Sequence, residues 1–366
     1  MSNISSIRPI IDSHVHIRHV DQRAGMERIR AALGIERMNI VCIYSREVIN
    51  HNPSGFAAKV EYPGNFYVFG GLDHSAYWSD GKIETPSLVE QVDRLLAIGC
   101  DGIKMLENKP THRRMVDLPI DGPYFAEYFE HVEALGVPIV WHVNDPEEFW
   151  FPELTPGWAK SRGWGYDQTW IPKEQLYSEV GNVLERHPDL NIVFAHFYFL
   201  SADLPRASRL LDQYPNVKLD VCPGIEMFYN MSRNPDAARE FFLKYQDRLI
   251  LGTDICSDHT DDEARKRLGV ITRWLSTSDE FRVPEGADFV LGPPEDGIMR
   301  GIALPTDVLS RIYRTNFEGL VGPPNLMDRE LAFEESMRIA REASILNDVP
   351  IESTQAYTAA QALNKD

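Results

Sequence analysis

The chain has 366 residues, of which 43% are hydrophobic, and its formal net charge is −18. A chain of this size and composition suits one large α/β barrel or two modest domains and argues against wholesale disorder. Because the sequence is strongly acidic, it lacks the clustered positive charge that nucleic acids and anionic membranes require. We therefore expect neither as a partner.

No membrane span or signal peptide is expected. No apolar run reaches the ~20 residues of a transmembrane helix, and the first residues, MSNISSIRP, lack the apolar core of a secretory signal. The four cysteines occur singly, without CxxC spacing, as Cys42, Cys100, Cys222 and Cys256. This pattern is typical of reduced thiols rather than of a disulfide framework or a zinc ribbon. We therefore expect a cytoplasmic protein.

Short apolar segments alternate with helix-like segments along the chain. The expected strands are residues 9–16, 38–44, 66–72, 102–106, 137–143, 190–197, 216–221 and 248–254. The expected helices between them are residues 26–33, 87–99, 124–135, 176–186, 207–214 and 237–245. Apolar strands that alternate with helices indicate a parallel sheet covered on its outer face, and eight such strands predict an α/β fold, the (β/α)₈ TIM barrel. An open doubly wound sheet would show a Gly-rich phosphate loop after the first strand, which this sequence lacks.

The connection at 144–175, after the fifth strand, is longer than a minimal barrel requires. Its tryptophans are Trp150, Trp158, Trp164 and Trp170. Because substrate loops leave the C-terminal ends of barrel strands, these indoles can wall an apolar pocket. The alternative is that the loop packs against itself.

The chain continues for about a hundred residues beyond the eighth strand, more than one closing helix needs. The expected helices there are residues 263–275, 306–313 and 326–346, with a Pro/Gly-rich excursion around 283–305. We expect residues 1–320 to form the barrel and residues 321–366 to form a C-terminal helical extension. This extension either clasps the barrel or forms the contact of a homodimer.

The first strand lies in the stretch PIIDSHVHIRH, residues 9–19, and carries a metal-ligand pattern. Side chains at i and i+2 share one strand face, so His14 and His16 lie side by side, with Asp12 one step below them. Two neutral imidazoles at this spacing can bind one divalent cation. Since a lone His-x-His is more often a pair of partly exposed histidines, the assignment depends on further ligands.

Ligand-type residues recur near the C-terminal ends of four later strands, as Lys104, His142, His196 and Asp254. Barrel enzymes assemble their active sites at this end of the strands. Each of these side chains by itself is more often structural. Their repetition on strand after strand favours a functional site.

The motifs IDSHVH, GIKML, VPIVWHV, IVFAHF and LILGTD resemble those of the amidohydrolase superfamily. They are most similar to the branch of metal-dependent TIM-barrel hydrolases that includes aminocarboxymuconate-semialdehyde decarboxylase. The resemblance covers residues 9–320, including the closing segment RIYRTNFEGLVG. It implies that one divalent metal ion is held by His14, His16, His142 and Asp254. Zn²⁺ is the expected ion and Mn²⁺ the alternative, with His196 beside it as an electrophile, an acid or a further ligand.

The implied chemistry is that of an activated water. A bound metal ion lowers the pKa of water from 15.7 to about 7. Asp254 can accept the proton of that water and deliver it to the leaving group, while His196 polarises a carbonyl. Asp12 can orient one of the imidazoles. Lys104 can pair with an acid, bind a substrate carboxylate or, when carboxylated, bridge a second metal; we expect one metal, as in the mononuclear branch.

Substrate-side residues are inferred from position. Arg113 and Arg114 follow the fourth strand on a rim loop and suit a carboxylate. Tyr198, just past His196, and Glu226, in the PGIEMF turn, can face the pocket. The leading interpretation is metal-dependent hydrolysis of an amide, lactone or ester bond in a small molecule. The alternatives are nonoxidative decarboxylation of an aromatic or unsaturated acid and a non-catalytic barrel, which the full ligand set disfavours.

Overall fold

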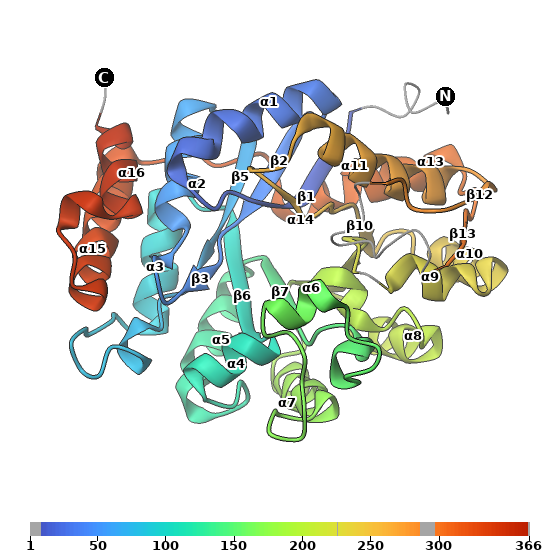
Figure 1. The fold of residues 1–366 in the computed structure, drawn as a ribbon, viewed down its shortest axis with the longest axis horizontal. Helices are drawn as coiled ribbons and strands as arrows, with labels where there is room; N and C mark the ends of the chain where they lie inside the picture. Colours follow the sequence, from blue (N-terminus) through green and yellow to red (C-terminus); the bar gives the residue numbers. More distant parts are fainter. Residues whose placement is uncertain (1–8, 225, 286–296, 365–366) are drawn as a thin grey trace.

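The computed structural model describes residues 9–224, 226–285 and 297–364 (Figure 1). Parallel strands form one nine-stranded sheet, in the order β10-β9-β8-β7-β6-β5-β2-β1-β11. Its strands are β1 (Ile11–His16), β2 (Arg37–Val41), β5 (Phe66–Gly71), β6 (Gly102–Asn108), β7 (Ile139–Val143), β8 (Ile192–Phe194), β9 (Val217–Asp220), β10 (Leu249–Ile250) and β11 (Ile255–Cys256). The TIM-barrel-like α/β fold that the sequence predicts is confirmed.

The two ends of this sheet are joined by the segment that runs from β10 to β11. β10 pairs with β9, and β11 pairs with β1, both in parallel. Between these pairs the carbonyl of Leu251 accepts a hydrogen bond from Ser13 at 2.9 Å, and the amide of Asp254 donates to the carbonyl of His14 at 2.9 Å. The eighth predicted strand is therefore one interrupted segment that contacts both β9 and β1.

Helices surround the sheet (Figure 1). The longer ones are α1 (Arg23–Leu33), α2 (Asn52–Glu61), α3 (Leu88–Ile98), α5 (Pro123–Leu135), α7 (Lys173–Arg186), α8 (Leu204–Gln213), α10 (Pro235–Lys244) and α11 (Asp261–Ser276). The shorter ones are α4 (Pro110–Val116), α6 (Gly157–Ser161), α9 (Met227–Ser232), α13 (Thr306–Ser310) and α14 (Asn316–Val321). Two small antiparallel strand pairs complete the barrel portion, β3 (Tyr44–Ser45) with β4 (Ile49–Asn50) and β12 (Glu280–Phe281) with β13 (Met299–Arg300).

Local signals explain why most helices lie where the sequence predicts them. Helix α3 begins at a capping box in which Ser87 and Glu90 satisfy each other's backbone amides, and it ends at Gly99, whose φ is +105°. Helix α2 was not predicted because its first turn reads NPSG, which resembles a loop. Its residues are nevertheless almost all buried, so tertiary packing rather than propensity stabilises it.

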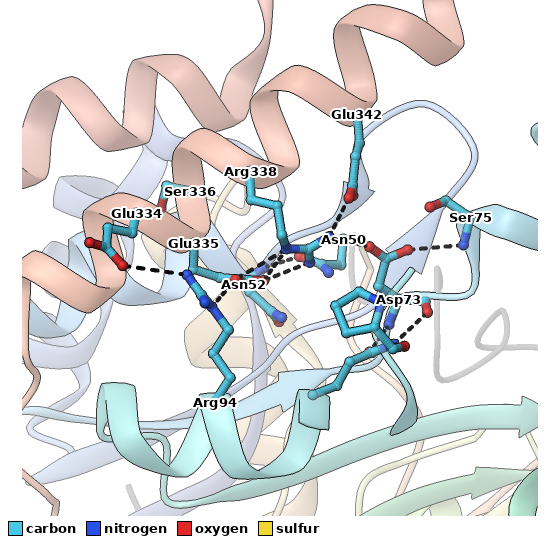
Figure 2. A network of polar contacts seen from close by, with 12 residues as sticks. Asn50, Asn52, Asp73, Ser75, Arg94, Glu334, Glu335, Ser336, Arg338 and Glu342 are labelled. Carbon is cyan, nitrogen blue, oxygen red and sulfur yellow. Dashed lines mark hydrogen bonds and ion pairs between the residues drawn. The ribbon is translucent and has the colours of Figure 1, made fainter. Parts of the chain in front are cut away.

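The C-terminal helices α15 (Arg329–Asn347) and α16 (Gln355–Leu363) pack against α2 and α3 (Figure 1). Figure 2 shows the polar network at this contact. Arg338 of α15 reaches the carboxylate of Asp73, just beyond β5, at 3.0 Å and also pairs with Glu335 and Glu342. This contact supports the clasp over the alternative of an exposed dimer helix, while a homodimer and the boundary at residue 320 stay predictions.

Within residues 9–224, 226–285 and 297–364, none of the helices combines the length and the apolar character needed to cross a bilayer. Two predicted features fall partly outside the described residues. The N-terminal MSNISSIRP lies mostly in residues 1–8, and the Pro/Gly-rich excursion at 283–305 includes residues 286–296.

The Arg338 network predicts a large loss of stability on Arg338→Met. Removing this cation leaves the buried Asp73 carboxylate with the amide of Ser75 but without a positive charge. The loss costs about 3 kcal/mol of unfolding free energy, the lower end for a broken buried ion pair. We choose the lower end because the Arg338 side chain is 18% exposed. Urea denaturation measures the change, with Arg341→Met on the exposed side of the same helix as control. Equal stability of the two variants would contradict the clasp.

Candidate metal centre and cavity

The first and last strands of the barrel bring two imidazoles and a carboxylate together. His14 and His16 end β1, and Asp254 lies between β10 and β11, where its φ of +56° interrupts the strand. One ligand atom from each of the three side chains lies within 4.8 Å of the others. Nε2 of His16 is 3.1 Å from Oδ1 of Asp254.

Hydrogen bonds at the opposite side of each ring fix the imidazole tautomers. Nδ1 of His14 is 2.8 Å from Oδ2 of Asp220, and Nδ1 of His16 is 2.9 Å from the carbonyl of Val41. Because a carbonyl and a carboxylate accept, both Nδ1 atoms carry the proton, which leaves a lone pair on each Nε2. Nε2 of His16 and the carboxylate of Asp254 then face each other as two acceptors, an arrangement that a shared cation stabilises. This donor set fits a divalent metal ion.

The charges at this centre also suit a cation. Burial lowers the pKa of His14 well below its ordinary value, and the nearby Lys104 adds to this effect, so the ring is neutral. Burial by itself would raise the pKa of Asp254, but the neighbouring imidazoles of His16, His196 and His14 outweigh it and hold that pKa well below its ordinary value. Neutral imidazoles and an ionised carboxylate are the forms in which these groups bind metals.

His196 reaches the same cavity through a left-handed turn. Strand β8 ends at Phe194, and η5 (Ala195–Phe199) follows, in which residues 196–199 all have φ between +51° and +56°. Left-handed backbone costs about 1 kcal/mol or more per residue outside glycine, so packing must hold this turn in place. The turn places the His196 ring 5.3 Å from the ring of His14, centroid to centroid.

The tautomer of His196 bears on its predicted roles. Its Nδ1 is 3.3 Å from the carbonyl of Cys222, so Nδ1 carries the proton and Nε2 does not. Burial lowers the pKa of His196 to about 4, which keeps the ring neutral. A neutral ring with a bare Nε2 accepts a proton or binds a metal rather than donating to an oxyanion. The role of His196 as a ligand, an acid or an electrophile stays a prediction, and a bare Nε2 suits a ligand.

Tyr198 does not line the cavity, contrary to the expectation from its position. Its ring stacks on Phe194 at 4.1 Å and packs edge-on against Tyr177 at 4.9 Å. The predicted strand over 190–197 would have continued to alternate faces, but the left-handed turn begins at His196 and redirects the chain. Phe199 lines the cavity instead and stacks on the His196 ring at 5.3 Å.

His142 lies beside His196, with ring centroids 4.7 Å apart. Its Nε2 is 3.0 Å from the carbonyl of Asn144 and 3.3 Å from Asp145, so Nδ1 is the nitrogen left for a ligand. Among the described residues, the groups whose ligand atoms come within 4.8 Å of one another do not include His142. The structure therefore places this predicted fourth ligand in the cavity but beside the cluster.

Asp145 ties the tryptophan-rich loop to the barrel. Its carboxylate accepts from Nζ of Lys109 at 2.5 Å and from the hydroxyl of Tyr166 at 2.5 Å. The ammonium of Lys109 also lies 4.6 Å from the centre of the Trp164 ring. These contacts hold the loop over the C-terminal ends of the strands.

The cavity that these elements enclose has a volume of about 200 Å³. Its metal-centre wall includes His16, His142, His196, Asp254 and Lys104, and its apolar wall includes Phe149, Trp158, Trp164 and Phe199. The four tryptophans of the loop also pack around a small cluster of Phe149, Ala159 and Tyr166. Both interpretations of the loop therefore hold, since it packs against itself and walls the cavity.

Lys104 is buried in this wall without a hydrogen-bond partner among the described residues. Burial lowers the pKa of its ammonium from 10.5 to about 8, while the carboxylate of Asp220 and its neighbours oppose this effect. Of the three alternatives predicted for Lys104, the described part of the structure does not contain the direct pair with an acidic side chain. The other two alternatives are binding of a substrate carboxylate and carboxylation of the amine.

The two arginines that the sequence predicted at the rim have other partners. Arg113 is buried, and its Nε lies 3.4 Å from Glu179. The guanidinium of Arg114 lies over the Trp170 ring at 4.4 Å. Neither lines the cavity, because the segment after β6 forms helix α4 and turns these side chains away from it. Arg18, which follows β1, is the arginine that does line it.

Asp12 does not orient an imidazole. Its carboxylate instead accepts from the amide and hydroxyl of Thr253 at 3.1 and 2.5 Å, and burial raises its pKa to about 7. Asp220, at the end of β9, takes the role expected of Asp12, through its bond to His14. The apolar segment NVKLDV ends in this acid just as other strands end in ligands, so the sequence did contain a signal for it.

Glu226 lies just behind the cavity wall. It is buried, and both of its carboxylate oxygens are without hydrogen-bond partners among the described residues. Burial, and then the nearby Glu148, raise the pKa of this carboxyl to about 8. Its Oε2 would lie 2.6 Å from a Cβ built on Gly224, which lines the cavity, so the absence of a side chain there makes room for the carboxyl.

Residues 80–316 match the model of the amidohydrolase family. This chain belongs to the amidohydrolase family. No curated protein matches its sequence.

Several solved structures share the fold of this amidohydrolase at low identity. An amidohydrolase II has a TM-score of 0.54 and 15% identity, over 85% of this chain and 99% of that one. A probable 2-pyrone-4,6-dicarboxylic acid hydrolase from Acinetobacter baumannii has a TM-score of 0.50 and 15% identity, over 86% and 100%. 5-Carboxyvanillate decarboxylase from Sphingomonas paucimobilis has a TM-score of 0.50 and 14% identity, over 86% and 99%. At such identities the likeness concerns the fold.

The burial of Lys104 predicts that this amidohydrolase gains stability in Lys104→Met. An amine whose pKa falls from 10.5 to about 8 on folding destabilises the metal-free protein by about 3 kcal/mol at neutral pH. The unfolded chain binds more protons than the folded one between pH 8 and pH 10.5, so wild-type stability rises over that range. Thermal unfolding of both proteins from pH 7 to pH 10.5 should show a gap that closes as pH rises. A variant less stable than wild type would contradict this assignment.

The bond from Asp220 to His14 predicts weaker metal binding in Asp220→Asn. Loss of a carboxylate that orients a ligating imidazole costs about 10–100-fold in metal affinity. Competition with a chromophoric chelator measures the metal affinity of both proteins. The wild-type chain should bind about one equivalent of metal. Glu107→Gln is the matched control, because Glu107 also bonds a buried imidazole, that of His74, at 2.8 Å. Two equivalents in wild type would overturn the single-metal expectation.

Proposed function

We propose that this protein is a metal-dependent hydrolase of an amide, lactone or ester bond in a small carboxylate-bearing molecule. The observation that carries the proposal is the acceptor pair formed by Nε2 of His16 and Oδ1 of Asp254, 3.1 Å apart. The ring proton of His16 is committed to the Val41 carbonyl. A cation between the two acceptors accounts for this geometry.

The residues proposed to hold the ion are His14, His16 and Asp254, with His142 and His196 beside them. Zn²⁺ is the expected ion, since imidazole and carboxylate ligands suit it. When bound, a divalent ion supplies Lewis acidity, which lowers the pKa of an attacking water and polarises a carbonyl.

Asp254 is the proposed proton acceptor. Its carboxylate is ionised at neutral pH and lies at the cavity, so it can take a proton from the attacking water as the oxygen–carbon bond forms. The bond to the leaving oxygen or nitrogen then breaks, and Asp254 returns the proton to that atom. His14 and His16 stay neutral and fixed by Asp220 and Val41 throughout.

The substrate class follows from the walls of the cavity. The buried ammonium of Lys104 is without a hydrogen-bond partner among the described residues, and a substrate carboxylate would satisfy it. The aromatic side chains of Phe149, Trp164 and Phe199 offer a flat apolar surface. A carboxylated ring or conjugated chain therefore suits the cavity, as do the ring acids named for the two structural neighbours.

Nonoxidative decarboxylation is the second candidate, and the same Lys104 favours it. Lys104 would hold the carboxylate in the metal-centre wall, where a single buried ammonium replaces its hydration, and the lost hydration raises its free energy relative to departing CO₂. In that reaction the carbon–carboxylate bond breaks, and the carbon that held CO₂ takes up a proton. The proton comes from solvent, and Asp254, whose carboxylate is ionised and lies at the same cavity, is the group placed to relay it.

We predict that the zinc-loaded protein opens carboxylated lactones or cleaves carboxylated esters and amides, and that a chelator abolishes the reaction. Asp254→Asn should lower kcat by about 10²- to 10⁴-fold, because proton transfer is lost. Proton release and ultraviolet absorbance follow hydrolysis, and a coupled assay follows CO₂. Asp247→Asn, at an exposed carboxylate, is the control. CO₂ release without hydrolysis would select the second candidate, and full activity of Asp254→Asn would defeat both.

A further inference from the structure

We propose that Cys222 binds the metal ion of this site through its sulfur, together with His14 and His196. This inference rests on the proposed metal-dependent function and adds a ligand that lies two residues beyond β9 and that the sequence motifs do not include. One ligand atom from each of these three residues lies within 4.8 Å of the other two. All three side chains are buried in the described structure, with Cys222 fully so.

A single carboxylate positions all three residues. Oδ2 of Asp220 holds Nδ1 of His14 at 2.8 Å, and Oδ1 accepts the backbone amide of His196 at 2.7 Å and that of Cys222 at 3.1 Å. The Nδ1 proton of His196 is donated to the carbonyl of Cys222. The lone pair of each ring is therefore on Nε2, and one ring nitrogen of each histidine lies in the same group as Sγ of Cys222.

A glycine allows the thiol and the imidazole to approach each other. A Cβ built on Gly252 would lie 3.0 Å from Cβ of His14 and 3.2 Å from Cβ of Cys222. Any larger residue at this position would press on both side chains. Glycine at this position therefore leaves room for His14, in β1, and Cys222, just beyond β9, to face the same metal ion.

Burial, and then the carboxylates of Asp220 and Asp254, raise the pKa of Cys222 well above its ordinary value, so the metal-free side chain is a neutral thiol. A metal ion deprotonates a thiol that coordinates it, so binding would release the Cys222 proton to solvent. A thiolate ligand biases the site toward Zn²⁺ or Co²⁺ and away from Mg²⁺ or Mn²⁺.

Cobalt spectroscopy tests this ligand directly. The protein is stripped with a chelator, given one equivalent of Co²⁺ and examined for the near-ultraviolet charge-transfer band that a cobalt-bound thiolate produces. We expect the band in wild type and its complete loss in Cys222→Ser. Cys256→Ser is the matched control and should keep the band, because Cys256 belongs to a different potential ligand group with Asp258 and His259. Zn X-ray absorption of wild type, which needs no variant, should show a sulfur at about 2.3 Å.

The outcomes separate this inference from the proposed function. Stoichiometric Co²⁺ without the band, or Zn²⁺ without a sulfur neighbour, overturns the role of Cys222 and leaves the metal site standing. A band lost in Cys256→Ser but kept in Cys222→Ser also overturns it, by moving the ion to the other group. Failure of wild type to bind Co²⁺ or Zn²⁺ overturns both the inference and the proposed function.

Discussion

The closure of the sheet by the segment between β10 and β11 is the constraint on which the rest of the structure depends. This segment bonds to β9 on one side and to β1 on the other. The amide of Asp254 donates to the carbonyl of His14, so the acid and the imidazoles from opposite ends of the chain are fixed at one place. Without this closure, the first and last strands would be separate edges and their ligands would not meet.

The site is ordered by groups that do not themselves face the cavity. Asp220 fixes the tautomer of His14 and accepts hydrogen bonds from two backbone amides. The carbonyl of Val41 fixes the tautomer of His16. The left-handed turn at 196–199 is held by aromatic packing, with Phe197 parallel to Phe242 and Tyr198 stacked on Phe194. Backbone strain at an active site persists only when its surroundings over-determine it, and here the core supplies that restraint.

The cavity combines aromatic walls and a metal-ligand cluster with a buried ammonium for which the described part of the chain offers no hydrogen-bond partner. Lys104 lies in the wall beside the cluster, while Asp145 anchors the aromatic loop above it. The proposed substrate, which carries a carboxylate on a flat apolar body, is inferred from this combination of an ammonium with aromatic rings.

The sequence alone determined the barrel, because the apolar runs and helix caps that define its strands and helices involve only residues close together in the chain. It also determined which strand ends carry His14, His16, His142, His196 and Asp254, since the carboxyl ends of parallel strands share one edge. Only the tertiary structure decided what depends on distant contacts. Asp220 rather than Asp12 orients His14, Tyr198 packs into the core, and Arg113 pairs with Glu179. The strand NVKLDV marks Asp220 as a strand-end acid, but the imidazole that it orients depends on a contact far along the chain, as the other two outcomes depend on a turn or a distant partner.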